Sequence, residues 1–165
     1  MGIFVEQAAP ADAKTVSDIL LEAAAWLRQR DMPMWRDNEL VPEVIAADVA
    51  EGFFFIGKCN NEIAGVIKFQ LEDKKFWPDV PDGESAYIHR LAVRRRFAGG
   101  EVSNQLLRWA VDRARNLKRH FVRLDCEASR PKLRAVYERF GFRHHSDLSV
   151  PPYFVSRYEY EISSI

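Results

Sequence analysis

The stretch from Tyr87 to Leu107, YIHRLAVRRRFAGGEVSNQLL, constrains the fold and the chemistry of this chain more than any other. A β-like segment ends in three arginines, passes the pair Gly99-Gly100 and continues as an amphipathic helix. The first backbone N–H groups of a helix have no partner inside the helix, and they carry the positive end of its dipole. This order therefore predicts a site for a phosphate-bearing ligand, and it favours a ligand-handling enzyme over a passive domain.

Hydrophobic periodicity predicts the secondary structure of the remaining chain. Helical spacing indicates helices over residues 12–28, 42–52, 101–117 and from about 131 to 141. Strand-like runs cover residues 3–7, 53–58, 62–72, 85–93, 120–126 and 153–162, and a further strand is expected just before the last one. Asn60-Asn61 indicates a hairpin turn, whereas residues 73–84 indicate a loop. The order β-α-α-β-β-β-α-β-α-β-β predicts a single mixed α/β domain over residues 1–165.

Two of these elements carry explicit predictions of burial. The helix over residues 101–117 should bury one stripe, formed by Val102, Leu106, Ala110, Ala114 and Leu117. The final strand should be half-buried, with Phe154, Ser156, Tyr158, Tyr160 and Ile162 alternating with Val155, Arg157, Glu159 and Glu161.

Composition and charge narrow the class of protein. The 165 residues suffice for one ordinary domain, and 47% apolar with 29% charged residues is typical of a soluble globular protein. The formal net charge is zero, which argues against a nucleic-acid partner, although residues 94–119 hold eight Lys or Arg against two acids. Two cysteines indicate a reducing compartment, and neither a signal peptide nor a membrane span is evident. We therefore expect a cytoplasmic protein without a membrane partner.

The glycine turn itself leaves two interpretations equally open. Gly99 and Gly100 permit unusual backbone angles and let a ligand approach the main chain, so the N–H groups of the next helical turn could hold a pyrophosphate. The same glycines could simply make a strand-to-helix turn. Glu101 favours this second interpretation, because a carboxylate at a helix start satisfies the dipole and competes with a bound anion.

The same stretch resembles the cofactor-binding segment of the GNAT superfamily, the acyl-CoA-dependent N-acetyltransferases. Leu91-Ala92-Val93 matches the end of that family's strand, Gly99 its first glycine, and Leu106-Leu107 the leucine pair of its helix. Val102 and Ser103 occupy the apolar and the last small-residue positions. Two residues depart from the pattern: Ala98 replaces the usual Arg, and Glu101 replaces the usual second glycine.

A second resemblance to the same family lies downstream, in LDCEASRPKLRAVYERFGFR. This segment is similar to the family's signature of a strand, an Asn, a helix and Tyr-Glu-x-x-Gly-Phe; the matching residues are Leu133, Tyr137, Glu138, Gly141 and Phe142. Arg130 replaces the Asn that usually hydrogen-bonds the pantetheine arm. Together the two segments imply a twisted mixed sheet of about seven strands flanked by about four helices.

The resemblance also implies an activity and a set of contacts. The expected reaction is the transfer of an acetyl group from acetyl-CoA to a primary amine of a small molecule or peptide, by direct attack and without a metal. Homodimers are common in the family. The residues implied at the cofactor are Leu91, Ala92, Val93, Arg94, Arg95, Arg96, Ala98, Gly99, Gly100, Glu101, Val102, Ser103, Asn104, Arg130 and Tyr137. For the run Arg94–Arg96, contact with phosphate and plain solvation are equally open.

The reaction needs a base for the amine and an acid for the thiolate, because an alkyl ammonium has a pKa of about 10.4. The family's matching tyrosine makes Tyr137 the expected acid, although its spacing alone would fit a packed core tyrosine. His89 is the candidate base, at a strand position where many relatives carry a Glu; a structural histidine is equally consistent with the sequence.

Other features carry less weight. His144-His145 lacks metal-ligand spacing, and Cys126 is expected to be a small buried residue rather than a nucleophile. Trp35, Phe76 and Trp77 flank loops that could line an acceptor pocket. With its three departures from the family pattern, the chain could instead be a degenerate relative that binds CoA weakly and serves as a sensor or partner-binding module.

Overall fold

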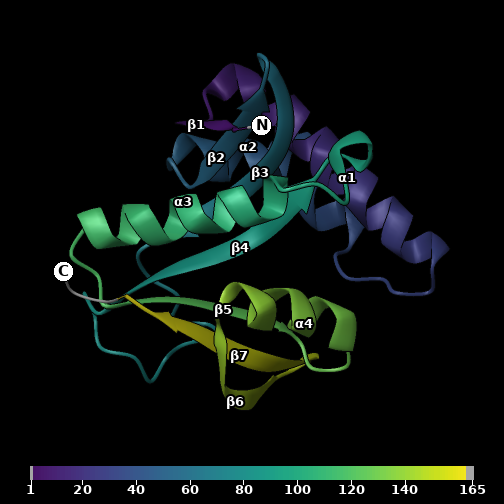
Figure 1. Ribbon diagram of the computed structural model, residues 1–165. Coiled ribbons are helices and arrows are strands. Elements are labelled where there is room, and N and C mark those ends of the chain that lie inside the picture. The colour runs from purple at the N-terminus through teal and green to yellow at the C-terminus, as the bar shows by residue number, and fades with distance from the viewer. Residues whose placement is uncertain (1, 163–165) are drawn as a thin grey trace. The chain divides into compact units, whose positions relative to one another are not determined.

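The computed structural model describes residues 2–162, which contain four α-helices and a seven-stranded mixed sheet (Figure 1). The strand order is β1-β2-β3-β4-β5-β7-β6. The strands are β1 (Phe4–Gln7), β2 (Phe54–Cys59), β3 (Glu62–Gln70), β4 (Ser85–Val93), β5 (Phe121–Glu127), β6 (Arg143–Val150) and β7 (Tyr153–Glu161). The helices are α1 (Ala13–Gln29), α2 (Pro42–Ala50), α3 (Val102–Asn116) and α4 (Pro131–Phe140). The predicted class and element order are confirmed.

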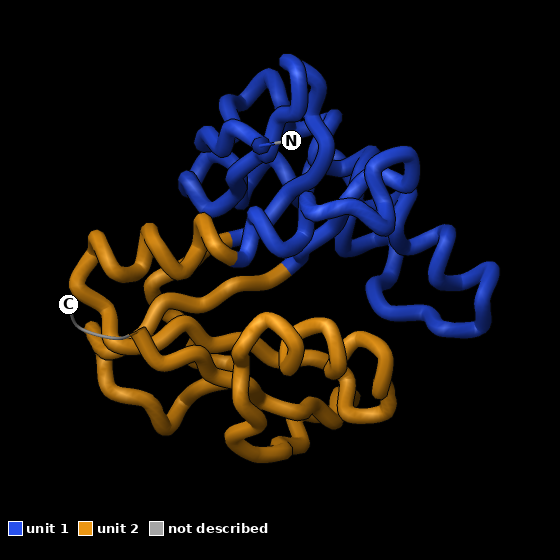
Figure 2. The backbone as a smooth tube through the Cα atoms, in the orientation of Figure 1, with its two compact units in different colours: residues 1–68, 90–107 blue, residues 69–89, 108–165 orange. Residues whose placement is uncertain are grey.

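The chain divides into two compact units, coloured separately in Figure 2. Unit 1 contains residues 1–68 and 90–107, and unit 2 contains residues 69–89 and 108–165. The boundaries fall inside β3, β4 and α3, so each of these three elements contributes residues to both units. One domain over residues 1–165 stays a prediction.

Unit 1 is built on the antiparallel strands β1, β2 and β3. The turn between β2 and β3 is formed by Asn60 and Asn61, which have φ angles of 52° and 67°, so the predicted hairpin is confirmed. Helix α1 covers its core with an apolar face in which Val16, Ile19 and Leu20 are fully buried.

A glycine sets how closely α3 approaches the strands of unit 1. A Cβ at Gly65 in β3 would lie 2.9 Å from the carbonyl oxygen of Ala92, 3.1 Å from Leu106 Cδ1 and 3.2 Å from Val102 Cγ1. Any side chain at this position would displace backbone or the first turns of α3. Gly65 therefore allows the first turns of α3 to approach β3 closely.

Unit 2 joins the start of β4 to β5, β7 and β6. The parallel ladder runs from Ser85 opposite Phe121 to Tyr87 opposite Arg123. Within the described part of unit 2 it goes no further, although β4 continues through His89 and β5 continues to Glu127. The backbone groups of β4 and β5 beyond this point are released from the ladder.

Two predictions of burial are wrong. In β7 the residues from Val155 to Tyr158 are all buried, whereas Phe154 is 55% exposed. Side chains of α4 cover one face of this strand, and the loop before β4 covers the other. Leu117 is 40% exposed because α3 ends at Asn116 and the chain turns through a left-handed Lys118.

None of the helices described in residues 2–162 is long and apolar enough to cross a membrane.

Candidate active site

The predicted strand, turn and helix are present in unit 1. Strand β4 ends at Val93, a short 3₁₀ turn covers Arg95–Phe97, and α3 begins at Val102. Gly99 has a φ of +81°, a conformation that favours glycine, and a Cβ there would meet no heavy atom within 4 Å. Residues 98–101 are exposed, so the main chain of this turn is accessible.

The start of α3 offers backbone donors next to this turn. The helical ladder begins with the N–H of Gln105 donating to the carbonyl of Glu101 over 2.9 Å. The N–H groups of Val102, Ser103 and Asn104 precede that bond, where an α-helix supplies no internal acceptor. A helix start beside an open glycine turn is a geometry that can bind an anion, and a pyrophosphate at this turn stays a prediction.

Acidic residues of unit 1 contact the side chains of Arg94 and Arg96 and the backbone of Arg95. Arg94 Nη1 lies 3.0 Å from Glu22 Oε2, and the backbone N–H of Arg95 donates to Glu22 Oε1 over 2.7 Å. Arg96 Nη1 lies 2.6 Å from Glu62 Oε2. These contacts join the segment to α1 and β3. The arginines thus have a structural role in addition to the two roles that the sequence leaves open, contact with phosphate and plain solvation.

A strained residue lies in β4 at the point where the chain passes from unit 2 back into unit 1. Arg90 has a φ of 52°, which interrupts the regular pleat of the strand and is unfavourable for a residue other than glycine. Its guanidinium lies 3.5 Å from Glu39 and 5.4 Å from the centre of the Trp35 ring. Trp35, expected near an acceptor pocket, thus packs on Arg90. Such strain is concentrated at functional sites.

In unit 2, His89 lies between two carboxylates. Its Nε2 atom is 3.0 Å from Asp73 Oδ2, and its Nδ1 atom is 3.7 Å from Asp125 Oδ1. The side chains of Asp73, His89 and Asp125 are 7%, 19% and 11% exposed. They come from the loop before β4, from β4 and from β5. The sequence analysis found His89 but missed both aspartates.

The loop that carries Asp73 is fastened by a buried tryptophan. The N–H of Trp77 donates to the Asp73 carbonyl over 3.0 Å, and its indole is 1% exposed. The guanidinium groups of Arg123 and Arg157 lie 5.2 Å and 4.5 Å from the ring centre, where cation–π attraction is effective. Trp77 therefore packs the loop onto the strands of unit 2. The neighbouring Phe76 has its ring centre 6.4 Å from that of His89.

Arg157 adds a second fastening. Its Nη1 donates to Asp79 Oδ1 over 2.8 Å and to the Phe76 carbonyl over 3.1 Å, and its Nε donates to Ser146 Oγ over 2.8 Å. The guanidinium holds the pKa of Asp79 below its usual range. Asp73 is thus presented by a loop with several fixed points.

Tyr137 and Cys126 form the other part of the unit 2 site. Burial raises the pKa of the Tyr137 hydroxyl, and the neighbouring Cys126 and Asp125 raise it further, so the phenol keeps its proton at neutral pH. Burial also raises the pKa of the Cys126 thiol to about 12, with a further contribution from Asp125. Cys126 is buried and protonated, as expected for a residue that is no nucleophile.

Comparison with known proteins identifies the family. The model of the Acetyltransferase (GNAT) family matches residues 20–142. The uncharacterized N-acetyltransferase YesJ of Bacillus subtilis (strain 168) is 31% identical over 147 residues, which cover 86% of this chain and 82% of YesJ. The chain belongs to the GNAT acetyltransferase family.

Solved structures agree with this assignment. A GNAT acetyltransferase from Listeria monocytogenes 4b F2365 superposes with a TM-score of 0.82 at 25% identity, covering 96% of this chain and 94% of that one. AAC(6')-Ib in complex with ribostamycin and coenzyme A shares the fold with a TM-score of 0.78 at 14% identity, covering 98% and 94%.

The remaining positions of the GNAT pattern lie at the end of β4 and just before α4. Leu91 and Val93 are half-buried and Ala92 is buried, at the end of β4. Arg130 directly precedes α4, and its Nε lies 2.9 Å from Glu127 Oε2. An arginine that is paired in this way replaces the Asn of the GNAT pattern.

Among residues 2–162, Asp73, His89 and Asp125 form one group whose ligand atoms all lie within 4.8 Å of one another, the spacing that a metal ion would need. The adjacent His144 and His145 have different partners: His144 Nε2 lies 2.8 Å from Asp147 Oδ1, whereas His145 Nδ1 lies 2.8 Å from Ser146 Oγ. The histidine pair is therefore divided between two contacts.

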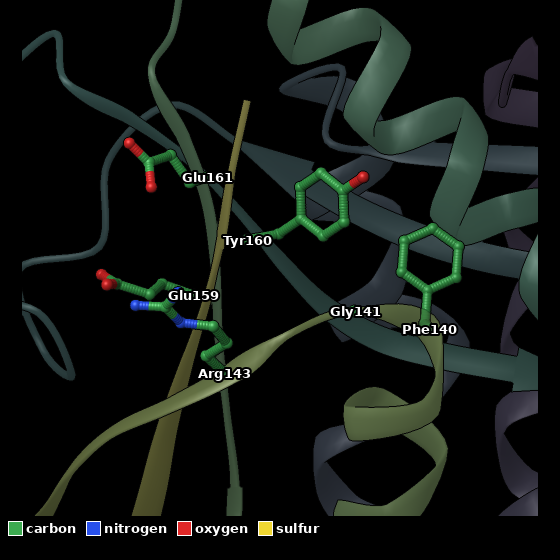
Figure 3. A pocket seen from close by; sticks show the side chains of 6 residues that line it. All are labelled: Phe140, Gly141, Arg143, Glu159, Tyr160 and Glu161. Atoms are coloured by element: carbon green, nitrogen blue, oxygen red, sulfur yellow. The ribbon is translucent and has the colours of Figure 1, made fainter. Parts of the chain in front are cut away.

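A separate pocket of unit 2 lies where α4 leads into β6 (Figure 3). Arg143 and Glu159 lie together on one side of it, and the rings of Tyr160 and Phe140 lie on the other. Its volume of about 330 Å³ is at the lower end of the range for small-molecule sites. Its six lining residues include none of the predicted site residues.

Proposed function

We propose that this GNAT protein transfers the acetyl group of acetyl-CoA to a primary amine of a small molecule or peptide by direct attack. The observation that carries this proposal is the set of titratable side chains in unit 2. An imidazole between two carboxylates and a phenol that keeps its proton are the base and the acid that amine acetylation requires.

The cofactor would be bound mainly by unit 1. The N–H groups of Val102, Ser103 and Asn104 would hold the diphosphate, and the backbone of Leu91 and Val93 would hold the pantetheine and the acetyl carbonyl. Support comes from the exposed left-handed Gly99 beside the helix start. The structurally similar AAC(6')-Ib is in complex with coenzyme A and ribostamycin, so amines of the ribostamycin type are one candidate class of acceptor.

The chemistry follows from the two titratable groups. His89 takes a proton from the acceptor ammonium, and the nitrogen lone pair then attacks the thioester carbonyl. The new C–N bond forms, the C–S bond breaks, and the phenol of Tyr137 gives its proton to the departing thiolate. The attacking nitrogen then loses its second proton, which restores the phenol of Tyr137, and the proton held by His89 passes to water. Direct attack is supported by Cys126, since a thiol with a pKa of about 12 supplies almost no thiolate to accept the acetyl group.

A second candidate function is a binder that has lost turnover. Ala98, Glu101 and Arg130 replace residues of the GNAT pattern, and Arg130 is paired with Glu127. Such a protein would bind CoA weakly and act as a sensor or a partner-binding module.

Two measurements separate the candidates. Saturating acetyl-CoA, at 100 times its dissociation constant, should stabilise either protein by about 2.7 kcal/mol, which is read as a rise in melting temperature. The purified protein is then incubated with acetyl-CoA and a panel of polyamines, aminoglycosides, amino acids and peptides. Release of free thiol together with a mass increase in one amine establishes the transferase. A thermal shift without release for any amine supports the binder, and no thermal shift contradicts both.

A further inference from the structure

The two ring nitrogens of His89 have unequal carboxylate neighbours. Asp73 Oδ2 is 3.0 Å from Nε2, which is direct contact, whereas Asp125 Oδ1 is 3.7 Å from Nδ1, too far for a hydrogen bond. A neutral imidazole carries one proton, on one of these two nitrogens. The nitrogen without the proton is the one that can act as a base.

The surroundings of Asp73 decide between the two tautomers. Its side chain is 7% exposed, and within the described chain its Oδ2 atom has no hydrogen bond of regular geometry, the 3.0 Å contact with His89 Nε2 included. A buried carboxylate oxygen is costly unless a positive or donating group faces it, and His89 Nε2 is the group in contact. The ring is not aligned for a regular hydrogen bond, but a proton on Nε2 directs positive charge toward the carboxylate, whereas a lone pair there would face a second lone pair at 3.0 Å.

We propose that Asp73 is the positioning residue of the base: it holds the His89 proton on Nε2 and so leaves the lone pair of Nδ1 to accept the proton of the amine. This inference rests on the proposed function for the role of His89. In the step, an N–H bond of the acceptor ammonium breaks, its electron pair stays on the amine nitrogen, and a new N–H bond forms at Nδ1. The resulting imidazolium lies between Asp73 and Asp125, whose charges stabilise it.

Such positioning needs a carboxylate that cannot drift, and the loop provides one. The N–H of Phe76 donates to Asp73 Oδ1 over 3.1 Å, which fixes the second oxygen of the carboxylate. Trp77 is buried against Arg123 and Arg157, and its backbone N–H donates to the Asp73 carbonyl, so it also holds the backbone of Asp73 in place. A base that is oriented by a third, rigidly held group is the arrangement that proton-transfer sites require.

The test replaces Asp73 by Asn and reads the tautomer directly. Long-range ¹H–¹⁵N spectra of the imidazoles are recorded at a pH where the rings are neutral, and His89→Gln identifies the His89 signals among the four histidines. The wild type should show Nε2–H. Asp73→Asn should invert this to Nδ1–H, because its amide can donate to Nε2. Asp82→Asn is the matched control, since Asp82 lies in the same loop and pairs with Lys74.

Kinetics give a second readout with an amine that the wild type acetylates. Asp73→Asn should lower kcat about 100-fold and leave the KM for acetyl-CoA unchanged, because it removes the base without touching the cofactor segment. Circular dichroism and the acetyl-CoA thermal shift show that the variant is folded. Asp73→Ala, which offers no donor, should give a mixture of tautomers and a smaller loss of kcat.

An unchanged Nε2–H signal in folded Asp73→Asn would overturn the proposal. A one-to-one zinc complex of the wild type that Asp73→Asn abolishes would overturn it as well, because the cluster would then be a metal centre. If the tautomer inverts but the wild type acetylates no amine, the proposed function fails while the positioning of His89 by Asp73 stands.

Discussion

The two units carry different kinds of candidate functional group. In unit 1 the groups are backbone amides at the start of α3, beside the exposed turn at Gly99. In unit 2 they are the side chains of His89, Asp73 and Tyr137, each held by burial or by a neighbouring charge. Backbone groups tolerate changes of side chain, whereas titratable side chains do not. Substitutions in unit 1 should therefore alter affinity by small factors, and substitutions in unit 2 should lower turnover or stability by larger ones.

The largest effect is expected from Tyr137→Phe in unit 2. Loss of the phenolic proton donor should lower kcat about 100-fold, or about 3 kcal/mol in barrier, because the thiolate then leaves without a proton. Acetyl-CoA affinity, measured by calorimetry, should stay within about twofold. Turnover that is unaffected across the whole pH range would remove Tyr137 as the acid.

Arg157→Met should destabilise the protein by about 2 kcal/mol. The variant loses the pair with Asp79 and leaves the Phe76 carbonyl without its guanidinium donor. Arg96→Met in unit 1 is the matched control; Arg96 pairs with Glu62 at the surface, and its loss should change stability by less than about 0.5 kcal/mol. Urea unfolding measures both. Equal effects would erase the contrast between the units.

Alkaline pH should weaken unit 2 through Cys126. A pKa of about 12 in the folded protein exceeds that of the unfolded chain, so this contribution is complete below about pH 9 and is lost as the pH rises toward 12. The stability difference between the wild type and Cys126→Ala should shrink by about 1 kcal/mol per pH unit above pH 9. Thermal melts at pH 8 to 11 test this, with Cys59→Ala as the control. A difference that stays constant with pH would refute the prediction.

The smallest effect is expected from Glu101→Gly at the turn of unit 1. Removal of a negative charge beside the start of α3 should tighten acetyl-CoA binding about threefold, within the 0.3–1 kcal/mol typical of helix-dipole interactions. Glu43→Gln, which removes an acid from the first turn of α2 in the same unit, should leave affinity unchanged. If calorimetry finds no tightening in Glu101→Gly, the carboxylate points away from the cofactor.

Most of the fold follows from local signals in the sequence. Asn60-Asn61 predicts the hairpin, and the apolar spacing of α1 and α3 predicts which faces are buried, because these patterns depend on residues close in the chain. The burial of β7 is different. Its alternation indicates one exposed face, but Arg157 is buried by a loop that lies far away in the sequence.

The candidate site divides in the same way. Gly99 and Tyr137 could be found because their neighbours along the chain match a family pattern. Asp73 could not, since it stands in a loop without periodicity and acquires its contact with His89 only when Trp77 packs. Similarly, the sequence shows three consecutive arginines but not the contacts of the first two with Glu22 on α1.

The missing side chain at residue 65 makes that position a spacer. With only a hydrogen atom between β3 and α3, the helix start can descend until Val102 and Leu106 touch the strand, and so the height of the anion-binding amides is set by the smallest residue available. Each carbon added to the side chain of residue 65 would push the first turns of α3, and with them these amides, further from β3. The apolar packing of Val102 and Leu106 on β3 thereby determines where an anion could contact the N–H groups at the start of α3.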